Sequence, residues 1–406
     1  PSSKVITKKH FKKNWPILSL VIDENDFYHP DTGLVPNKSS RGRQWERPVY
    51  CSYFDEKGAL RFASMAGMRM HGGKRMQLYN SYRLYFRKEY GQSQFSEFRP
   101  KIGFSGKAEP VKRLVVHHTA WPEGGWHFNN TLAYDIAHRI GCQVPETRLA
   151  LLYLNGVEQG VYFFVPHIGE QLLAAYFGHN DFLYLKYKSD LSSNNKVLNV
   201  RLWGVLRERG KLTMQVAGKV VNLDNLARHL FSFIFCGTTD YYQGLAVLDT
   251  SQPDKKVFWI NWDMDQSFIW DVYSNEIAMT EWQQRGWDLV YMDPPYTAND
   301  VRPRLFSRLL HEDPAYRQYV LTLYRDLLNH RLNARFAKER LSYYSTMLES
   351  YGKKKTKYMR MLDELMKRRP EVIRKETERL FKLGPSLLCQ VTGPPDVRYE
   401  IDGYDE

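Results

Sequence analysis

The chain has 406 residues, of which 43% are apolar and 14% aromatic. A chain of this size and composition can bury a large core, which excludes a disordered protein and allows two or three domains. No apolar run reaches the roughly 18 to 20 residues of a membrane helix, and no short apolar segment follows the basic start in the manner of a signal peptide, so we expect no membrane span in this chain; a leader or anchor that has been removed stays open. The net charge of +13 favours an anionic partner such as a nucleotide, a nucleic acid or an acidic lipid.

The four cysteines are scattered through the chain without the paired spacing of a zinc site. Cys142 and Cys236 lie in apolar surroundings and are predicted to be ordinary core thiols. Two sequences, NKS at Asn37 and NNT at Asn129, match the pattern for N-glycosylation, which also occurs often by chance. The cysteine pattern leaves the cellular compartment open.

The first third of the chain is predicted to be rich in strands. PILSLVI is a strand, and a long turn-rich loop follows it. Further strands are predicted in RPVYCSYF, ALRFASMAGMRMHGG and NSYRLYFRKEYG. In the last of these, Tyr82, Leu84 and Phe86 alternate with positions that include Arg83 and Arg87, which predicts a half-exposed strand with one buried and one basic face.

The middle of the chain alternates between helices and strand pairs. Residues 129–141 have helical spacing, and Gly141 is expected to end that helix. LALLYL and GVYFFV form a predicted hairpin around NGVEQG. A second helix, VNLDNLARHLFSFIF, has a cap near Asn222 to Asp224. GLAVLD and KVFWINWD follow as another strand pair.

The chain after about residue 300 is predicted to be helical throughout. Pro370 is expected to separate its last two helices, KYMRMLDELMKRR and EVIRKETERLFK. The apolar positions of the first of these form a packing stripe (Met359, Leu362, Leu365 and Met366).

Two carboxylates, Asp263 and Asp265, follow the apolar run VFWINW. Two like charges this close to an aromatic core raise each other's pKa unless a cation or hydrogen-bond donors compensate. A divalent metal is one compensation, and a turn in which both carboxylates accept backbone N–H groups is the other. The pair therefore forms a candidate metal site.

The order of these features matches the order of tasks in a protein kinase. There, a glycine turn and a basic side chain hold phosphates, a loop aspartate orients the hydroxyl, and an aspartate after a hydrophobic strand holds magnesium. Here the loop acid is Asp240, and Asp263 follows it after one strand pair.

From PILSL to DQSF, residues 16 to 268, the sequence resembles the spore coat protein H (CotH) kinases, which are atypical protein kinases of bacteria and some eukaryotes. The similar blocks are GMRMHGG, SYRLYFRKEYG, TLAYDIAHRIG, LLYLNGVEQGVYFF, DNLARHL, TTDYY and INWDMDQSF. The resemblance implies an α+β fold, two-lobed and like that of an atypical protein kinase, with a helical C-terminal extension. Residues 1–168 would form a β-rich N-lobe-like region, 169–300 a C-lobe-like core, and 301–406 the extension.

The resemblance also implies transfer of phosphate from ATP, with Mg²⁺ or Mn²⁺, to a hydroxyl group of an unknown acceptor protein. The catalytic aspartate falls on Asp240, and the metal aspartate falls on Asp263 with Asp265 beside it. Nucleic acid is not an expected partner. Because the family is often exported, we expect an extracytoplasmic or cell-envelope location in a bacterium.

Several basic and glycine residues of the strand-rich part are candidates for holding the nucleotide phosphates: Arg69, Gly72, Gly73, Lys74 and Arg83. Glycine lets a backbone approach an anion closely, but an ordinary hairpin uses glycine equally well. Arg83 either contacts phosphate or pairs across its sheet. Asp135 is a candidate helix acid that anchors a basic strand residue, although an ordinary ion pair with Arg139, four residues on, is favoured.

The chain departs from the family pattern at three positions. Leu245 stands five residues after Asp240, where a metal-binding Asn is usual, Asn80 replaces a Lys, and Pro166 replaces a Glu. Gln243 or Asp265 are substitutes for the first role, and Lys74, Arg83 or Arg87 for the second. The departures favour an alternative, a pseudokinase-like envelope protein that binds a nucleotide or a partner without transfer. A metal-dependent hydrolase is less favoured, because no histidine or acid cluster in the sequence completes a two-metal site.

Overall fold

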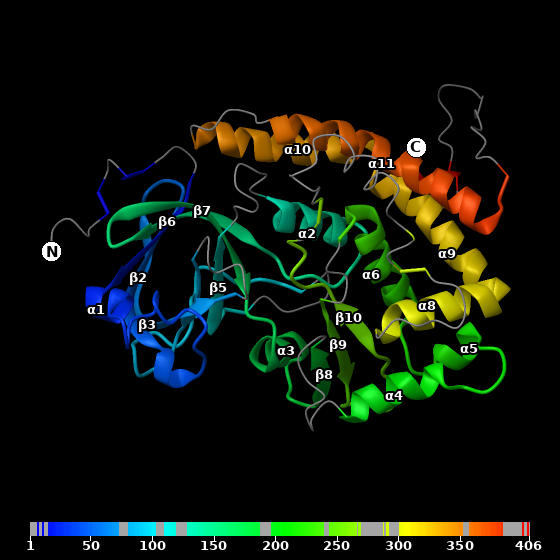
Figure 1. The fold of residues 1–406 in the computed structure, drawn as a ribbon, viewed down its shortest axis with the longest axis horizontal. Helices are drawn as coiled ribbons and strands as arrows, with labels where there is room; N and C mark the ends of the chain where they lie inside the picture. Colours follow the sequence, from blue (N-terminus) through cyan, green and yellow to red (C-terminus); the bar gives the residue numbers. More distant parts are fainter. Residues whose placement is uncertain are drawn as a thin grey trace.

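The structure is a computed structural model with a strand-rich part at one end and a helix-rich part at the other (Figure 1). It describes residues 6–7, 10–11, 15–72, 80–102, 109–118, 128–186, 196–238, 243–265, 267–268, 287, 290–291, 300–351, 357–384, 400–401 and 404–405. The chain is thus a mixed α/β protein. Among the described residues, no helix has the length and apolar character needed to cross a membrane.

Seven strands close into a barrel in the order β1-β2-β3-β4-β5-β7-β6. They are β1 (Ile17–Ile22), β2 (Arg47–Phe54), β3 (Leu60–His71), β4 (Ser81–Tyr85), β5 (Arg113–His118), β6 (Arg148–Leu154) and β7 (Val157–Pro166). Neighbours run antiparallel except β1 and β6, whose parallel pairing closes the ring. The short helix α1 (Glu24–Tyr28) and the 3₁₀ turn Arg43–Trp45 lie in the loop after β1. The predicted strands of this part are confirmed.

The hairpin between β6 and β7 is confirmed, but its turn is shorter than the predicted NGVEQG, because β7 already begins at Val157. Asn155 and Gly156 both have positive φ, 50° and 81°. Two successive positive φ angles define a type I′ turn, whose twist matches that of the paired strands. The turn therefore fixes the register in which β6 and β7 pair.

The strand β4 differs from its prediction, because both of its faces are buried. Tyr82 and Leu84 point into the barrel and are fully buried. Tyr85, on the opposite face, is only 4% exposed. The guanidinium carbons of Arg69 and Arg87 lie 4.3 and 5.1 Å from the centre of its ring, so arginine side chains rather than water cover this face.

A second, three-stranded sheet has the order β10-β9-β8 and packs against the helices of the second half. Its strands are β8 (Phe182–Lys186), β9 (Leu245–Asp249) and β10 (Phe258–Ile260); β11 (Glu400–Ile401) and β12 (Tyr404–Asp405) form a separate pair. The helix α2 (Asn129–Arg139) lies between β5 and β6, and α3 (Glu170–Phe177), α4 (Lys196–Leu206), α5 (Met214–Ala217) and α6 (Leu223–Cys236) lie between β7 and β9. The predicted strand pair and both predicted helices, now β9–β10, α2 and α6, are confirmed.

The local signals at the ends of α6 and α2 act as predicted. The Asn222 side chain accepts the Asn225 N–H at the start of α6, and Gly237 ends the helix in a left-handed conformation. Gly141, just beyond α2, also has a positive φ of 87°. Cys142 and Cys236 are both fully buried, and burial raises the pKa of the Cys142 thiol to about 12, as befits an inert core residue.

The C-terminal part is helical as predicted from Val301 to Phe381 and packs on α6, whereas the strand pair β11–β12 near the end of the chain departs from the prediction. It contains α8 (Val301–Glu312), α9 (Pro314–Asp326), the π-helical turn Leu327–Arg331, α10 (Ala334–Ser350) and α11 (Lys357–Phe381). Figure 1 shows α10 and α11 along one edge of the molecule, with α10 reaching toward the barrel. Trp15 before β1 donates its indole N–H to Ser350 at 2.7 Å, which ties the end of α10 to the barrel.

The prediction that Pro370 separates two helices is wrong, because α11 continues through it. Proline removes one helical hydrogen bond and crowds the preceding turn. Tertiary contacts on both sides outweigh this cost: Met366 and Ile373 are buried, and Arg369 is only 1% exposed. Arg369 donates to the backbone oxygens of Ile234 and Phe235 at the end of α6.

Replacing Arg369 by Leu should lower the free energy of unfolding by about 2 to 4 kcal/mol, because it leaves buried carbonyl groups of α6 without their donor. The matched control is Arg368→Leu, since Arg368 is exposed on the same helix, and its effect should stay within about 0.5 kcal/mol. Urea unfolding of the two variants measures the difference. Equal effects would mean that Arg369 does not hold α11 on α6.

Candidate functional site

The segment that carries Asp263 leaves the second sheet through a buried asparagine. Asn261 is fully buried just after β10. Its backbone N–H donates to the Gln143 oxygen at 2.8 Å, and its side-chain amide donates to Ser232 Oγ at 2.7 Å. These bonds fix the chain two residues before Asp263.

A buried polar chain supports Asn261 from the other side. Arg302 Nη1 lies 2.7 Å from His229 Nε2, and His229 Nδ1 lies 2.9 Å from Asn261 Oδ1. Because arginine only donates, Nε2 accepts and Nδ1–H donates to Asn261. Burial, and then the Arg302 charge, hold the pKa of His229 well below its usual value, so this arrangement is retained at neutral pH.

Arg302 also holds the segment that follows Asp240. It donates from Nη1 to the Gln243 backbone oxygen at 2.9 Å and pairs with Asp300 at 2.5 Å. One fully buried guanidinium thus fixes the segments before β9 and after β10.

The backbone at Asp263 has an unusual conformation that α2 stabilises. Asp263 has a φ of 55°, a left-handed value that costs an L-residue roughly 1 kcal/mol and is often found at functional sites. Its N–H donates to Tyr134 Oη at 3.1 Å, and the Met264 N–H donates to Asn130 Oδ1 at 3.1 Å.

Asn129 donates to the Ser267 oxygen at 3.0 Å and is buried, so its glycosylation motif is covered in the folded chain.

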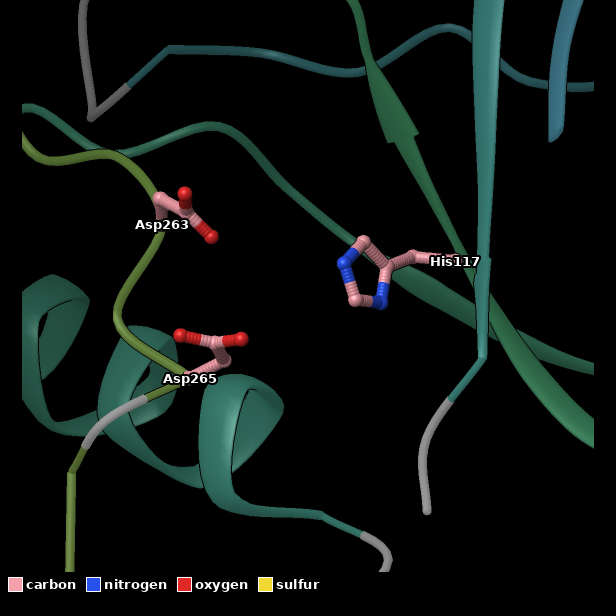
Figure 2. A group of neighbouring side chains, drawn as sticks. All are labelled: His117, Asp263 and Asp265. Atoms are coloured by element: carbon pink, nitrogen blue, oxygen red, sulfur yellow. The ribbon is translucent and has the colours of Figure 1, made fainter. Parts of the chain in front are cut away.

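Three side chains converge beside this segment, as Figure 2 shows: His117 at the end of β5, Asp263 and Asp265. One potential ligand atom from each lies within 4.8 Å of the others, and all three residues are half-buried. Carboxylate oxygens and an imidazole nitrogen are a donor set that fits a divalent cation. The two aspartates are therefore brought together as predicted, and a histidine from the barrel joins them.

Two cations, Lys186 and Arg83, lie near this cluster. Arg83 on β4 has Nη2 2.9 Å from His71 Nδ1, which accepts because arginine only donates. Lys186 ends β8, with its ammonium 5.9 Å from the centre of the Trp262 ring. Burial, and then the charge of Arg83, lower the pKa of Lys186, while Asp263 acts in the opposite direction. Lys186 thus lies within electrostatic range of both Arg83 and Asp263.

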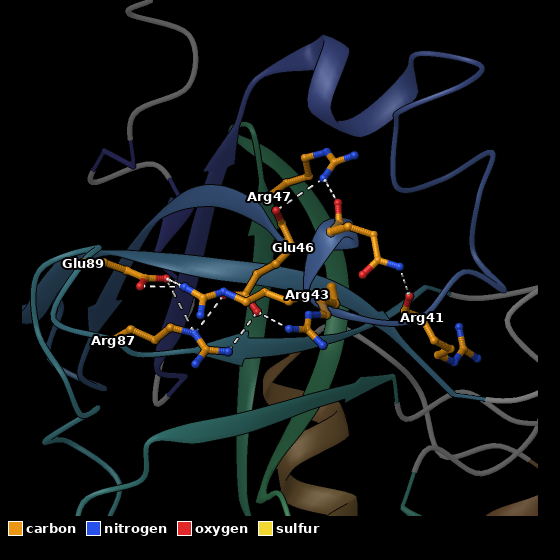
Figure 3. A network of polar contacts seen from close by, with 8 residues as sticks. Arg41, Arg43, Glu46, Arg47, Arg87 and Glu89 are labelled. Atoms are coloured by element: carbon orange, nitrogen blue, oxygen red, sulfur yellow. Dashed lines mark hydrogen bonds and ion pairs between the residues drawn. The ribbon is translucent and has the colours of Figure 1, made fainter.

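Arg69 lies on the same side of the barrel but is held by an acid, Glu46. Arg69 Nη2 lies 2.6 Å from Glu46 Oε2. Arg87 Nε lies 3.0 Å from Oε1 of the same carboxylate, as Figure 3 shows. Burial alone would raise the pKa of Glu46, but the hydrogen bonds from Arg87 and Arg69 and their charges hold it below its usual value. Arg69 is therefore held by Glu46, whereas Arg83, its partner across β3 and β4, is bonded to His71, whose ring lies 6.0 Å from that of His117.

The remaining predicted site residues are placed only in part. Gly72 has a φ of 111°, which favours glycine, and its carbonyl accepts Arg41 Nη2 at 3.0 Å. Gly73, Lys74 and Asp240 lie outside the described residues. Their roles stay predictions.

The three departures from the family pattern lie in ordinary structural positions. Leu245 begins β9, is 1% exposed and pairs with Ile260 of β10. Pro166 ends β7, and the backbone oxygen of Asn80 accepts Tyr162 Oη at 2.9 Å. A side chain at 245 therefore points into the apolar core.

The favoured ion pair of Asp135 with Arg139 is not the one formed. Asp135 accepts the Tyr344 hydroxyl at 2.6 Å and lies 3.6 Å from Arg340, both on α10. Arg139 instead donates to the Arg331 backbone oxygen at 3.3 Å. Helix packing brings α10 within reach of Asp135, which spacing along α2 alone does not predict.

A basic pocket of about 360 Å³ opens farther along the same face of the barrel. Its lining includes Arg87, Lys88, Lys112 and Arg113, together with the ring of Tyr85. Arg113 lies four residues before His117 on β5, so this lining residue is about 13 Å along the strand from His117 at 3.3 Å per strand residue. This face therefore presents positive charge well beyond the carboxylate site.

The fold and the site together define a mixed α/β protein whose site lies between a closed barrel and a second sheet. The barrel contributes a histidine and an arginine, and the second sheet and the segment after it contribute a lysine and two carboxylates. The family model described as CotH kinase protein matches residues 68–201 and 213–379. The chain belongs to the CotH kinase family. The search of curated proteins gives no match.

Sequence reasoning missed His117 and Lys186. Both end strands, at HH in RLVVHH and at K in FLYLK, and a polar residue at the end of an apolar strand is the signal that identified Asp263. Neither strand was singled out from the sequence, and no local pattern relates either residue to Asp263. Only the closure of the barrel against the second sheet brings them together.

The buried histidines predict a loss of stability in mild acid. Burial, and then the charges of Arg83, Lys186 and Arg113, lower the pKa of His167 to about 2. The unfolded chain takes up this proton below about pH 6.5 and the folded chain does not, so the free energy of unfolding falls as the pH falls. His167→Gln should make this fall shallower by about 1.4 kcal/mol per pH unit between about pH 4.5 and 6. Urea unfolding at several pH values measures it, and an unchanged slope would contradict it.

Proposed function

We propose that this protein is a CotH-like atypical protein kinase that transfers the terminal phosphate of ATP to a hydroxyl group of an acceptor protein. Membership of the CotH kinase family supports the reaction class. The observation that carries the proposal is the convergence of Asp263 and Asp265 with His117, beside Arg83 and Lys186. Such a site can hold a cation and the phosphate groups of a nucleotide at the same time.

In the proposed kinase-like fold, the barrel within residues 1–168 forms the first lobe and residues 169–300 form the core of the second. Residues 301–406 are the helical extension. The location of the site supports this division, because His117 and Arg83 come from the barrel while Asp263, Asp265 and Lys186 come from beyond it. A ligand between them contacts both parts.

Each residue assigned to the site has its own role in the proposed phosphate transfer. Asp263 and Asp265 hold Mg²⁺ or Mn²⁺, which when bound neutralises charge on the phosphate oxygens. Arg83 and Lys186 bind phosphate oxygens that carry the remaining charge. Asp240, in the role implied by the family, aligns the acceptor hydroxyl and takes its proton as the new P–O bond forms and the bond to ADP breaks.

A buried Leu245 favours a second candidate function, that of a pseudokinase-like protein that binds nucleotide without transfer. Its side chain belongs to the apolar core, so this position supplies no ligand for a second cation. The acceptor protein and the extracytoplasmic or cell-envelope location belong to the proposal on the strength of the family resemblance alone.

ATP with Mg²⁺ should raise the melting temperature, because a ligand at 100 times its Kd that binds only the folded state adds about 2.7 kcal/mol. Asp263→Asn should remove most of this shift while the protein without ligand stays folded. Asp254→Asn, an exposed change in the β9–β10 connection, is the control and should keep the full shift. A full shift in the Asp263 variant would exclude Asp263 as the metal residue.

Incubation with labelled ATP and Mg²⁺ or Mn²⁺, followed by mass spectrometry of the protein, should find phosphate on Ser, Thr or Tyr. Asp240→Asn should abolish this transfer and keep the ATP-dependent rise in melting temperature, since Asp240 is assigned to the hydroxyl rather than to the nucleotide. Binding of ATP without any transfer by the parent protein would identify the pseudokinase instead.

A further inference from the structure

We propose that His117 is a third protein ligand of the cation held by Asp263 and Asp265, and that the site therefore prefers a first-row transition-metal ion such as Mn²⁺ to Mg²⁺. The inference rests on the proposed function in one respect, since it concerns the same cation site. It adds a ligand from the barrel and a class of metal.

The three potential ligand atoms are already close enough to share one ion. They lie within 4.8 Å of one another. Three atoms at most 4.8 Å apart lie within about 2.8 Å of a common centre, so a shift of roughly 1 Å each brings all three to a bonding distance of about 2.1 Å from one ion. His117 and the aspartates approach from opposite sides, as Figure 2 shows, which leaves the space for the ion between them.

The imidazole of His117 is oriented for ligation by a hydrogen bond outside the cluster. Its Nδ1 lies 2.8 Å from the backbone oxygen of His118. A carbonyl oxygen only accepts, so Nδ1 carries the hydrogen and Nε2 keeps its lone pair. Figure 2 shows the ring nitrogen farther from the backbone turned toward the carboxylates. Metal-binding histidines commonly have this outer hydrogen bond, which fixes both tautomer and ring orientation.

Stacking holds the ring in the same orientation. The His117 ring lies 5.0 Å from that of Phe163, at an interplanar angle of 24°. Phe163 is buried on β7, the strand next to β5, so the imidazole has a rigid support. A ligand that is held in place before binding loses little conformational freedom when the ion arrives.

The nitrogen ligand decides the class of metal. Mg²⁺ takes oxygen ligands and keeps much of its water, whereas imidazole suits the first-row transition metals. An oxygen-only pair of aspartates would not make this distinction strongly. A histidine from the barrel therefore favours a first-row transition metal over Mg²⁺; Mn²⁺, which also takes carboxylate ligands, is the weakest-binding member of that series and serves as its spectroscopic probe.

In the test, the full chain without nucleotide is titrated with Mn²⁺. Electron paramagnetic resonance measures the concentration of free Mn²⁺ and so gives the amount bound. Bound Mn²⁺ should show an electron spin-echo modulation from a coordinated nitrogen. His117→Ala should lose that modulation and bind Mn²⁺ about tenfold or more weakly. Its affinity for Mg²⁺, measured by competition with Mn²⁺, should change by less than about threefold.

His118→Asn is the matched control, since it changes the neighbouring side chain on β5 and keeps the backbone oxygen that orients His117. It should keep both the nitrogen signal and the Mn²⁺ affinity. A nitrogen signal that survives in His117→Ala, or an unchanged Mn²⁺ affinity in that variant, overturns the inference. Absence of Mn²⁺ binding in the parent chain overturns it as well.

Failure of this inference and failure of the proposed function give different results. If Mg²⁺ supports ATP binding and transfer but no nitrogen signal is seen, His117 is not a ligand and the kinase proposal stands. If Mn²⁺ binds with the nitrogen signal but ATP neither binds nor reacts, the metal site stands and the kinase proposal fails.

Discussion

The buried side chain of Arg302 connects the separate segments of this site. It is paired with Asp300, donates to the backbone before β9, and reaches Asn261 after β10 through His229. A buried charge is costly unless it is paired and fully hydrogen-bonded, and here the bonds serve segments far apart in the sequence. The helices of the second half therefore determine where Asp263 lies, although none of them carries a ligand of the site.

Local sequence signals predicted the elements that depend on local interactions. The Asn155–Gly156 turn, the Asn222 cap and Gly141 after α2 all act within a few residues, so their effects are visible in the sequence. The continuation of α11 through Pro370 is the opposite case. There, contacts of Arg369 with the end of α6 override a local rule, and no pattern within α11 contains that information.

The same distinction applies to the site. The aspartates at 263 and 265 were recognised because two carboxylates at the end of an apolar strand are unusual by themselves. His117 is unremarkable on its strand and becomes informative only when the barrel brings it to the aspartates. Arg69 and Arg83, both basic residues on neighbouring strands, were equivalent candidates in the sequence. Glu46, brought beside Arg69 by the pairing of β2 with β3, separates their surroundings.

The anchoring of α2 has a consequence for how this protein can be controlled. Its first turn is bonded to the segment around Asp263, and its middle is bonded through Asp135 to Tyr344 of α10. The far end of α10 is bonded in turn to the barrel through Ser350 and Trp15. In many kinases the corresponding switch is an outward rotation of one helix beside the site. Here such a rotation would break the contacts of α2 with the Asp263 segment and with α10 together, so α2 is held in place from both sides.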